Sequence, residues 1–158
     1  MPETIEDQGG SIIVQLSFFL PNRLGALLRA TRELDAKGIR ICALSILDAA
    51  DHAVVRMVVD RPTDAKSALI TEGYAVFETD LLGVALPAGK GLGIGKVLSA
   101  LLMAEVNIHY IYPLAVQADA HPVIVLHVDD MHAASRVLRQ KGLDLIGQDE
   151  LAWPPDSI

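Results

Sequence analysis

The chain has 158 residues, of which 51% are hydrophobic and 21% charged, and its formal net charge is −7. This length suits one ordinary domain or two small ones. The acidic balance, with no run of lysine or arginine, argues against nucleic-acid binding, which draws its affinity from clustered cations. No apolar stretch approaches the ~20 residues of a membrane span, and residues 1–10 lack the basic and apolar regions of a signal peptide. We therefore expect a cytoplasmic protein with no nucleic-acid or membrane partner.

The sequence matches itself at a shift of 69 residues, with Ile39 on Ile108 and Asp60 on Asp129, and no gap is needed from about residue 28 to residue 80. Near the start, the Leu-Pro pair at residues 20–21 matches the pair at residues 86–87 at a shift of 66, so the second copy carries three extra residues after its first strand. An internal repeat indicates two copies of one structural module. We place these modules at residues 11–80 and 81–150.

Both copies show the same order of predicted elements, read from hydrophobic periodicity and from turn residues. In the first copy they are a strand at 11–20, a helix at 24–37, strands at 39–47 and 52–60, a helix capped by Thr63 or Asp64 and running to residue 72, and a strand at 74–80. In the second copy they are a strand at 81–86, a helix at 93–106, strands at 107–117 and 121–128, a helix at 130–141, and a strand at 143–150. In the helix at 24–37, residues 24, 27, 28, 31 and 34 form the predicted apolar face.

The order β-α-β-β-α-β, found twice, predicts an α+β fold of two ferredoxin-like modules, each an antiparallel sheet with its helices on one face. The strands are apolar on both sides: residues 39, 41 and 43 alternate with the equally apolar 42, 44 and 46. A sheet with one face in water would alternate apolar with polar residues. The second face therefore needs a cover, and we expect at least a homodimer.

The loop between the first strand and the first helix carries the candidate ligand site. Asn22 can accept hydrogen bonds from helix N–H groups, and Gly25 allows the backbone to approach a ligand closely. Helix N-termini favour carboxylates and phosphates. The alternative reading is that Asn22 only caps the helix.

Residues 20–41, reading LPNRLGALLRATRELDAKGIRI, resemble the signature of the ACT domain. The matching positions are Asn22, Arg23, Gly25, Leu27, Gly38 and Ile39. Leu24 stands where the family usually has proline. In the second copy, residues 96–112 resemble the family's helix and following strand, but the preceding loop at 87–95 is longer and lacks an acidic residue or asparagine. Gly91 and Gly93 compete there for the position of the family glycine.

The resemblance implies a regulatory protein that binds a small amino acid, without a cofactor and without catalysis. It implies ligand-binding residues in both copies, namely Leu20, Pro21, Asn22, Arg23, Leu24, Gly25, Ala26, Gly91, Leu92, Gly93, Asn107 and Ile108. The alternative function is a non-catalytic dimerising or interaction subunit of a metabolic enzyme, with vestigial ligand sites. An enzyme on a dimeric α+β barrel is a third reading, which lacks acid–base residues to support it.

Other motifs in the sequence do not indicate a nucleotide site, a metal site or a reactive cysteine. The glycine-rich run at residues 89–96 fails the Walker A pattern because residue 90 is lysine and Val97 follows the Gly-Lys pair. The five histidines do not show the convergent spacing of a metal site. The single cysteine, Cys42, lies in an apolar strand and is interpreted as a buried, inert thiol. We therefore expect neither a metal nor a cofactor.

Overall fold

The structure is a computed structural model that describes residues 11–21, 23–87, 93–118 and 121–151. It divides the chain into two compact units. The N-terminal unit comprises Val14–Thr79, and the C-terminal unit comprises Asp80–Leu151 together with the described residues up to Ile13. Among the described residues, no helix combines the length and the apolar character needed to cross a membrane.

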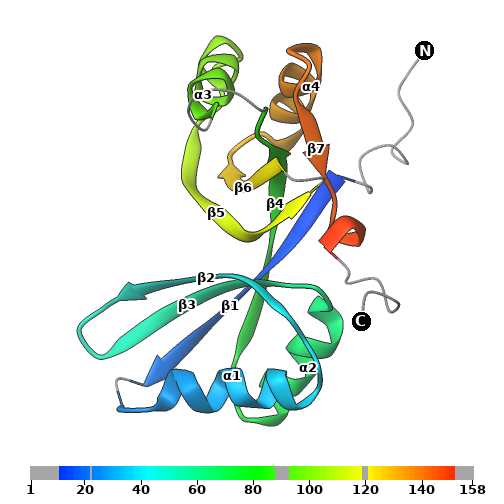
Figure 1. Ribbon diagram of the computed structural model, residues 1–158. Helices are drawn as coiled ribbons and strands as arrows, with labels where there is room; N and C mark the ends of the chain where they lie inside the picture. The colour runs from blue at the N-terminus through cyan, green and yellow to red at the C-terminus, as the bar shows by residue number, and fades with distance from the viewer. Residues whose placement is uncertain (1–10, 22, 88–92, 119–120, 152–158) are drawn as a thin grey trace. The chain divides into compact units, whose positions relative to one another are not determined.

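The N-terminal unit is one βαββαβ module (Figure 1). Its elements are β1 (Ile12–Pro21) from Val14 onward, α1 (Ala26–Ala36), β2 (Ile41–Asp48), β3 (His52–Val59), α2 (Pro62–Thr71) and the first part of β4 (Val76–Ala85). The strand order is β2-β3-β1-β4. Strands β1 and β3 pair antiparallel, as do β2 and β3.

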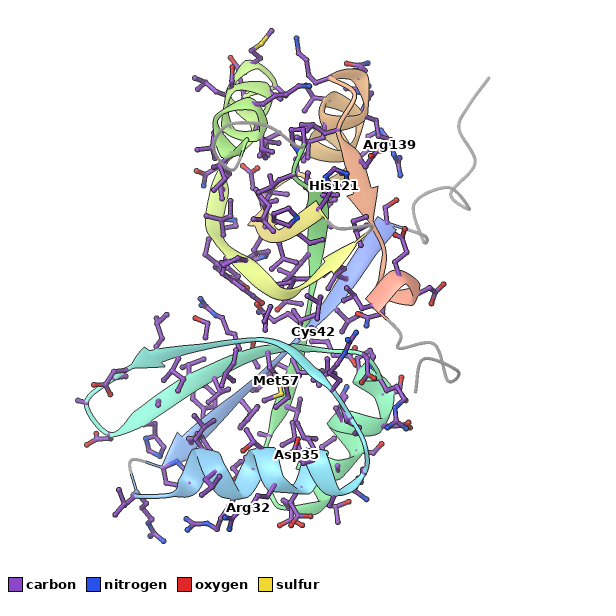
Figure 2. The ribbon with its side chains drawn as sticks, viewed as in Figure 1. Arg32, Asp35, Cys42, Met57, His121 and Arg139 are labelled. Carbon is purple, nitrogen blue, oxygen red and sulfur yellow. The ribbon has the colours of Figure 1, made fainter. Side chains whose placement is uncertain are left out.

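The core of this unit lies between the sheet and its two helices. Every second residue of β1 and β3 enters it, as the period of two in a strand requires. The strands contribute Leu16, Phe18, Leu20, Val55, Met57 and Val59, and the helices contribute Ala26, Ala30, Leu34, Ala65, Ala68 and Leu69. Figure 2 shows Met57 between the sheet and α1, with Arg32 on the outer side of that helix.

The C-terminal unit repeats the module. It uses the second part of β4, then α3 (Ile94–Met103), β5 (Ile108–Ala118), β6 (His121–Val128), α4 (Met131–Gln140), β7 (Asp144–Ile146) and a 3₁₀ helix (Gln148–Leu151). Strand β4 pairs antiparallel with β6 on one side and with β7 on the other, and β5 pairs with β6. The predicted fold class, two βαββαβ modules built on antiparallel strands, is confirmed.

Some predicted boundaries are wrong. The strands predicted to meet at residues 80 and 81 form one uninterrupted strand, β4, which continues from one unit into the other. The strand predicted at 143–150 is short, because the chain turns into the 3₁₀ helix after Ile146. The residue at the N-cap position of helix α2 is Arg61, which makes no side-chain capping hydrogen bond, and Pro62 follows it; the predicted cap was Thr63 or Asp64. A proline suits the first helical position because its missing N–H has no intrahelical acceptor there.

The predicted apolar face of α1 is also partly wrong. The helix begins at Ala26, so Leu24 precedes it and is fully exposed, and Leu28 is 52% exposed. Leu34 is buried and Leu27 packs against the core, as predicted, but the other buried residues of the helix are Ala26 and Ala30. Small side chains on this face allow the helix to approach the sheet closely, which hydrophobicity alone does not indicate.

At the ends of their first helices, the two copies do not correspond at the predicted shift of 69 residues. Gly38 and Glu105 occupy the same left-handed position after α1 and α3, with φ of 68° and 55°. The next residues, Ile39 and Val106, donate to the carbonyls of Leu34 and Leu101 at 3.0 Å each. Ile39 is therefore the counterpart of Val106 and not of Ile108. The copies return to the predicted register by β3 and β6, because β5 is longer than β2 and its pairing shifts between Pro113 and Gln117.

Candidate functional site

A tight turn joins β1 to α1. The Arg23 N–H donates to the Pro21 carbonyl at 2.7 Å, and the Ala26 N–H donates to the Arg23 carbonyl at 3.2 Å. Gly25 is the N-cap of α1, with φ of 79° and ψ of 1°. Residues that carry a Cβ atom rarely adopt this left-handed backbone conformation, so glycine suits the position. Because glycine has no side-chain acceptor, Gly25 makes no side-chain hydrogen bond to the N–H groups of the first helical turn.

A pocket of about 390 Å³ lies beside this turn. Its walls come from the turn, from the first part of α1, and from β2 and β3. The lining residues are Leu20, Pro21, Arg23, Leu24, Gly25, Ala26, Leu27, Leu28, Ile46 and Ala53. Small-molecule pockets usually measure about 300–1,000 Å³, so the volume suits a small ligand.

The structure brings together six of the seven residues predicted for the first copy: Leu20, Pro21, Arg23, Leu24, Gly25 and Ala26. The seventh, Asn22, lies outside the described residues. Four further lining residues were not predicted: Leu27, Leu28, Ile46 and Ala53. The helical period offers a signal for Leu28, which lies one turn after Leu24. No local signal exists for Ile46 and Ala53, because the register of the β2–β3 hairpin brings them to the pocket.

The second copy has the same turn geometry at its helix. Gly93 is the N-cap of α3, with φ of 69° and ψ of 7°. Gly93 therefore corresponds to Gly25 in its position at the start of the helix. The other candidate glycine, Gly91, lies outside the described residues, as does Leu92. The surroundings differ, because a Cβ atom on Gly93 would lie 3.0 Å from the Cδ and Cγ atoms of Pro87. A Cβ atom on Gly25 would meet its nearest neighbour, Arg29 Nη1, at 3.5 Å.

Asn107 and Ile108 do not lie beside Gly93. They follow α3, whose 10 residues separate them from Gly93 by about 15 Å of helix. The Asn107 N–H donates to Asp129 Oδ1 at 3.0 Å, and the Asp129 N–H donates to the Asn107 carbonyl at 3.1 Å. This reciprocal pair joins the start of β5 to the end of β6 and thus gives Asn107 a structural role.

The N-terminal unit contains the same reciprocal pair. The Arg40 N–H donates to Asp60 Oδ1 at 2.9 Å, and the Asp60 N–H donates to the Arg40 carbonyl at 3.0 Å. Arg40 is thus the structural counterpart of Asn107. The repetition in both units indicates that this contact belongs to the architecture of the module.

Cys42 and the ring cluster around His127 are the other groups in the described structure with side chains able to carry chemistry. The thiol of Cys42 is buried, and burial raises its pKa, which disfavours the thiolate that a nucleophile or a metal ligand needs. The ring of His127 lies 4.8 Å from that of His109 and 4.9 Å from that of Tyr110, because a register shift after Ile108 places two β5 residues opposite one β6 residue. Among the described residues, no group of three or more metal-ligating side chains comes together.

Known structures with the same fold include regulatory proteins. A protein from Bacteroides thetaiotaomicron matches with a TM-score of 0.80 and 33% identity, over 89% of this chain and 96% of that one. The ligand-free regulatory subunit of aspartate kinase from Thermus thermophilus matches with a TM-score of 0.57 and 17% identity, over 82% of this chain and 92% of that one. The corresponding subunit from Thermus flavus gives a TM-score of 0.54 and 17% identity, over 82% and 92% of the two chains.

None of the curated proteins matches the chain in sequence. The family model of the ACT domain pair matches residues 11–153. This match covers both modules described above and confirms the resemblance seen at residues 20–41. The chain therefore belongs to the family of ACT domain pairs, a regulatory and non-catalytic type of domain.

Proposed function

We propose that this protein is a regulatory module that binds a small amino acid at the pocket beside Gly25. The observation that carries the proposal is a pocket of about 390 Å³ at the N-terminus of α1, where six predicted residues of the β1–α1 turn face Ile46 and Ala53 of the β2–β3 hairpin. Helix N-termini attract anions, and the Arg23 guanidinium adds a positive charge to the same lining. The carboxylate of an amino acid is thus expected at this end of the pocket. The fold shared with regulatory subunits of aspartate kinase supports a sensing role.

We further propose that the modules at residues 11–80 and 81–150 differ in their affinity for this ligand. The loop of the second copy is longer, and Pro87 crowds the space next to Gly93. The first copy is therefore expected to be the stronger site. Gly93→Val is expected to reduce binding less than Gly25→Val does, although its contact with Pro87 makes it the more destabilising change.

The first experiment is a thermal-shift screen against the twenty amino acids. A ligand that binds only the folded state stabilises it by about 2.7 kcal/mol when present at 100 times its dissociation constant. We expect at least one amino acid to raise the melting temperature. If none does, at millimolar concentration, the ligand-binding proposal is wrong.

The second experiment locates the site by calorimetric titration of Gly25→Val. A valine there carries a β-branched side chain at a left-handed position and obstructs the backbone approach. We expect a loss of at least ~10-fold in affinity, which is about 1.4 kcal/mol. Gly73→Val is the matched control, because Gly73 also has a left-handed φ, of 94°, and an added Cβ would meet nothing within 4 Å there. Equal losses in both variants would show that backbone strain, and not the pocket, is responsible.

We also propose that the protein is a homodimer. On β1, Phe19 points away from the core that its neighbours Phe18 and Leu20 enter, and its ring packs edge-on against Phe77 at 6.2 Å. Val54 on β3 is the register partner of both Phe19 on β1 and Leu47 on β2, so the three residues form a row across the sheet. Phe19, Leu47 and Phe77 are each more than half exposed, and a row of apolar side chains on a sheet face favours a protein partner.

The same row favours the alternative function, an interaction subunit of a metabolic enzyme with vestigial ligand sites. Both proposed functions predict a dimer, and the amino-acid screen distinguishes the ligand-binding regulator from the interaction subunit. Light scattering at micromolar concentration tests the assembly: a species of twice 17.0 kDa is expected, and Phe19→Ser is expected to weaken it. A single species of 17.0 kDa would refute the dimer.

A further inference from the structure

The pocket beside Gly25 is lined mainly by aliphatic side chains. Five of its lining residues are leucine or isoleucine, namely Leu20, Leu24, Leu27, Leu28 and Ile46. Ala26 and Ala53 add further apolar surface, and Arg23 is the one charged residue among the described lining residues. The described lining thus contains no carboxylate.

Several of these side chains are exposed to water in the free protein. Leu24 is fully exposed, and Leu28 and Ile46 are 52% and 48% exposed. Removing such apolar surface from water is favourable, in proportion to the area buried. A ligand that covers these three residues with hydrocarbon therefore gains affinity that a small or polar ligand does not.

A positively charged ligand side chain has no acidic partner among the described lining residues. The ammonium of lysine would lie among leucines with no described carboxylate nearby, and desolvating an unpaired charge is costly. A second carboxylate, as in aspartate, would compete with the first for Arg23. The hydroxyl of threonine would likewise lie against aliphatic side chains.

We propose that the ligand is a branched aliphatic amino acid: leucine, isoleucine or valine. This inference rests on the proposed function, because it specifies the ligand class of the same pocket. The carboxylate lies at the Arg23 end, and the branched side chain covers Leu28 and Ile46.

Calorimetric titration with L-leucine, L-isoleucine, L-valine, L-alanine, L-threonine, L-lysine and L-aspartate tests the ligand class. We expect at least one branched aliphatic amino acid to bind ~10-fold or more tightly than alanine, lysine and aspartate, since a single methylene in an apolar pocket is already worth about 10-fold or more. Tightest binding of lysine, threonine or aspartate, lost in Gly25→Val, would overturn the ligand class and leave the proposed function standing. Binding of none of the twenty amino acids would instead overturn the proposed function.

Variants of the lining test the placement of the ligand side chain. Ile46→Ser is expected to reduce the affinity for the best-binding branched amino acid by ~10-fold, which is about 1.4 kcal/mol. Leu44→Ser is the matched control: Leu44 lies two residues earlier on the same face of β2, is 42% exposed, and does not line the pocket. If Ile46→Ser does not fold, Leu28→Ser on the exposed side of α1 makes the same test. Unchanged affinity in the folded variant would overturn the placement.

Discussion

Glu105 occupies a backbone conformation that disfavours its own side chain. Its φ is 55°, and it is the one non-glycine residue with positive φ in the described parts of the chain. Its N–H donates to the Leu102 carbonyl at 3.1 Å, and the following Val106 N–H donates to the Leu101 carbonyl at 3.0 Å. These are the two bonds of a Schellman motif, which usually has glycine at this position. The equivalent residue after α1 is Gly38.

Glu105→Gly is therefore expected to stabilise the protein. A left-handed residue with a Cβ costs about 1–2 kcal/mol. Glycine removes this cost. It also makes the unfolded chain more flexible, which lowers the free energy of unfolding by about 0.4–1 kcal/mol. The midpoints of these two ranges give a net gain of about 0.8 kcal/mol. For a chain of this size the melting temperature is expected to rise by about 1–4 °C.

Calorimetry and urea unfolding of three variants measure this effect. Glu105→Ala removes the charge and keeps the Cβ, so its free energy of unfolding is expected to stay close to that of the parent. Gly38→Ala introduces the same strain in the N-terminal unit, where the added Cβ would have only an ordinary contact, at 3.6 Å from Arg61 Nη2. This variant is expected to be destabilised by about 0.8 kcal/mol, by the same two terms with opposite sign. If Glu105→Gly is no more stable than Glu105→Ala, backbone strain at Glu105 is not the cause.

Cys42 is expected to react with a thiol reagent at pH 8 far more slowly in the native protein than in urea, because burial both blocks access and raises the pKa of its thiol; equal rates would contradict this. Asp60→Ala removes the acceptor of the Arg40 N–H, and Asp129→Ala removes the acceptor of the Asn107 N–H. Each change is expected to lower the free energy of unfolding by about 1–2 kcal/mol. Urea titration measures this loss, and an unchanged midpoint would refute the stabilising role of the two aspartates. One calorimetric unfolding transition is expected, because β4 runs through the boundary between the two units; two separate peaks would argue against this coupling.

The order of elements could be read from the sequence because its signals are local. Alternating apolar residues indicate strands, the helical period indicates helices, and a glycine that must adopt positive φ shows where a helix begins or ends. The turn at Gly25 is such a signal, and six predicted residues around it line one pocket. Both the family and the position of the candidate site depended on these short-range features.

Features that depend on pairing between distant segments required the tertiary structure. Ile46 and Ala53 reach the pocket only through the register of the β2–β3 hairpin, and a shift by one residue would send each to the other face of the sheet. The offset between the copies was hidden because Glu105 replaces the expected glycine. Hydrophobicity also pointed to Leu24 and Leu28 as core residues of α1, yet the helix buries Ala26 and Ala30 and leaves both leucines in the open pocket. Close packing selects small residues there, and only the three-dimensional fold determines which side of a helix must approach its neighbours closely.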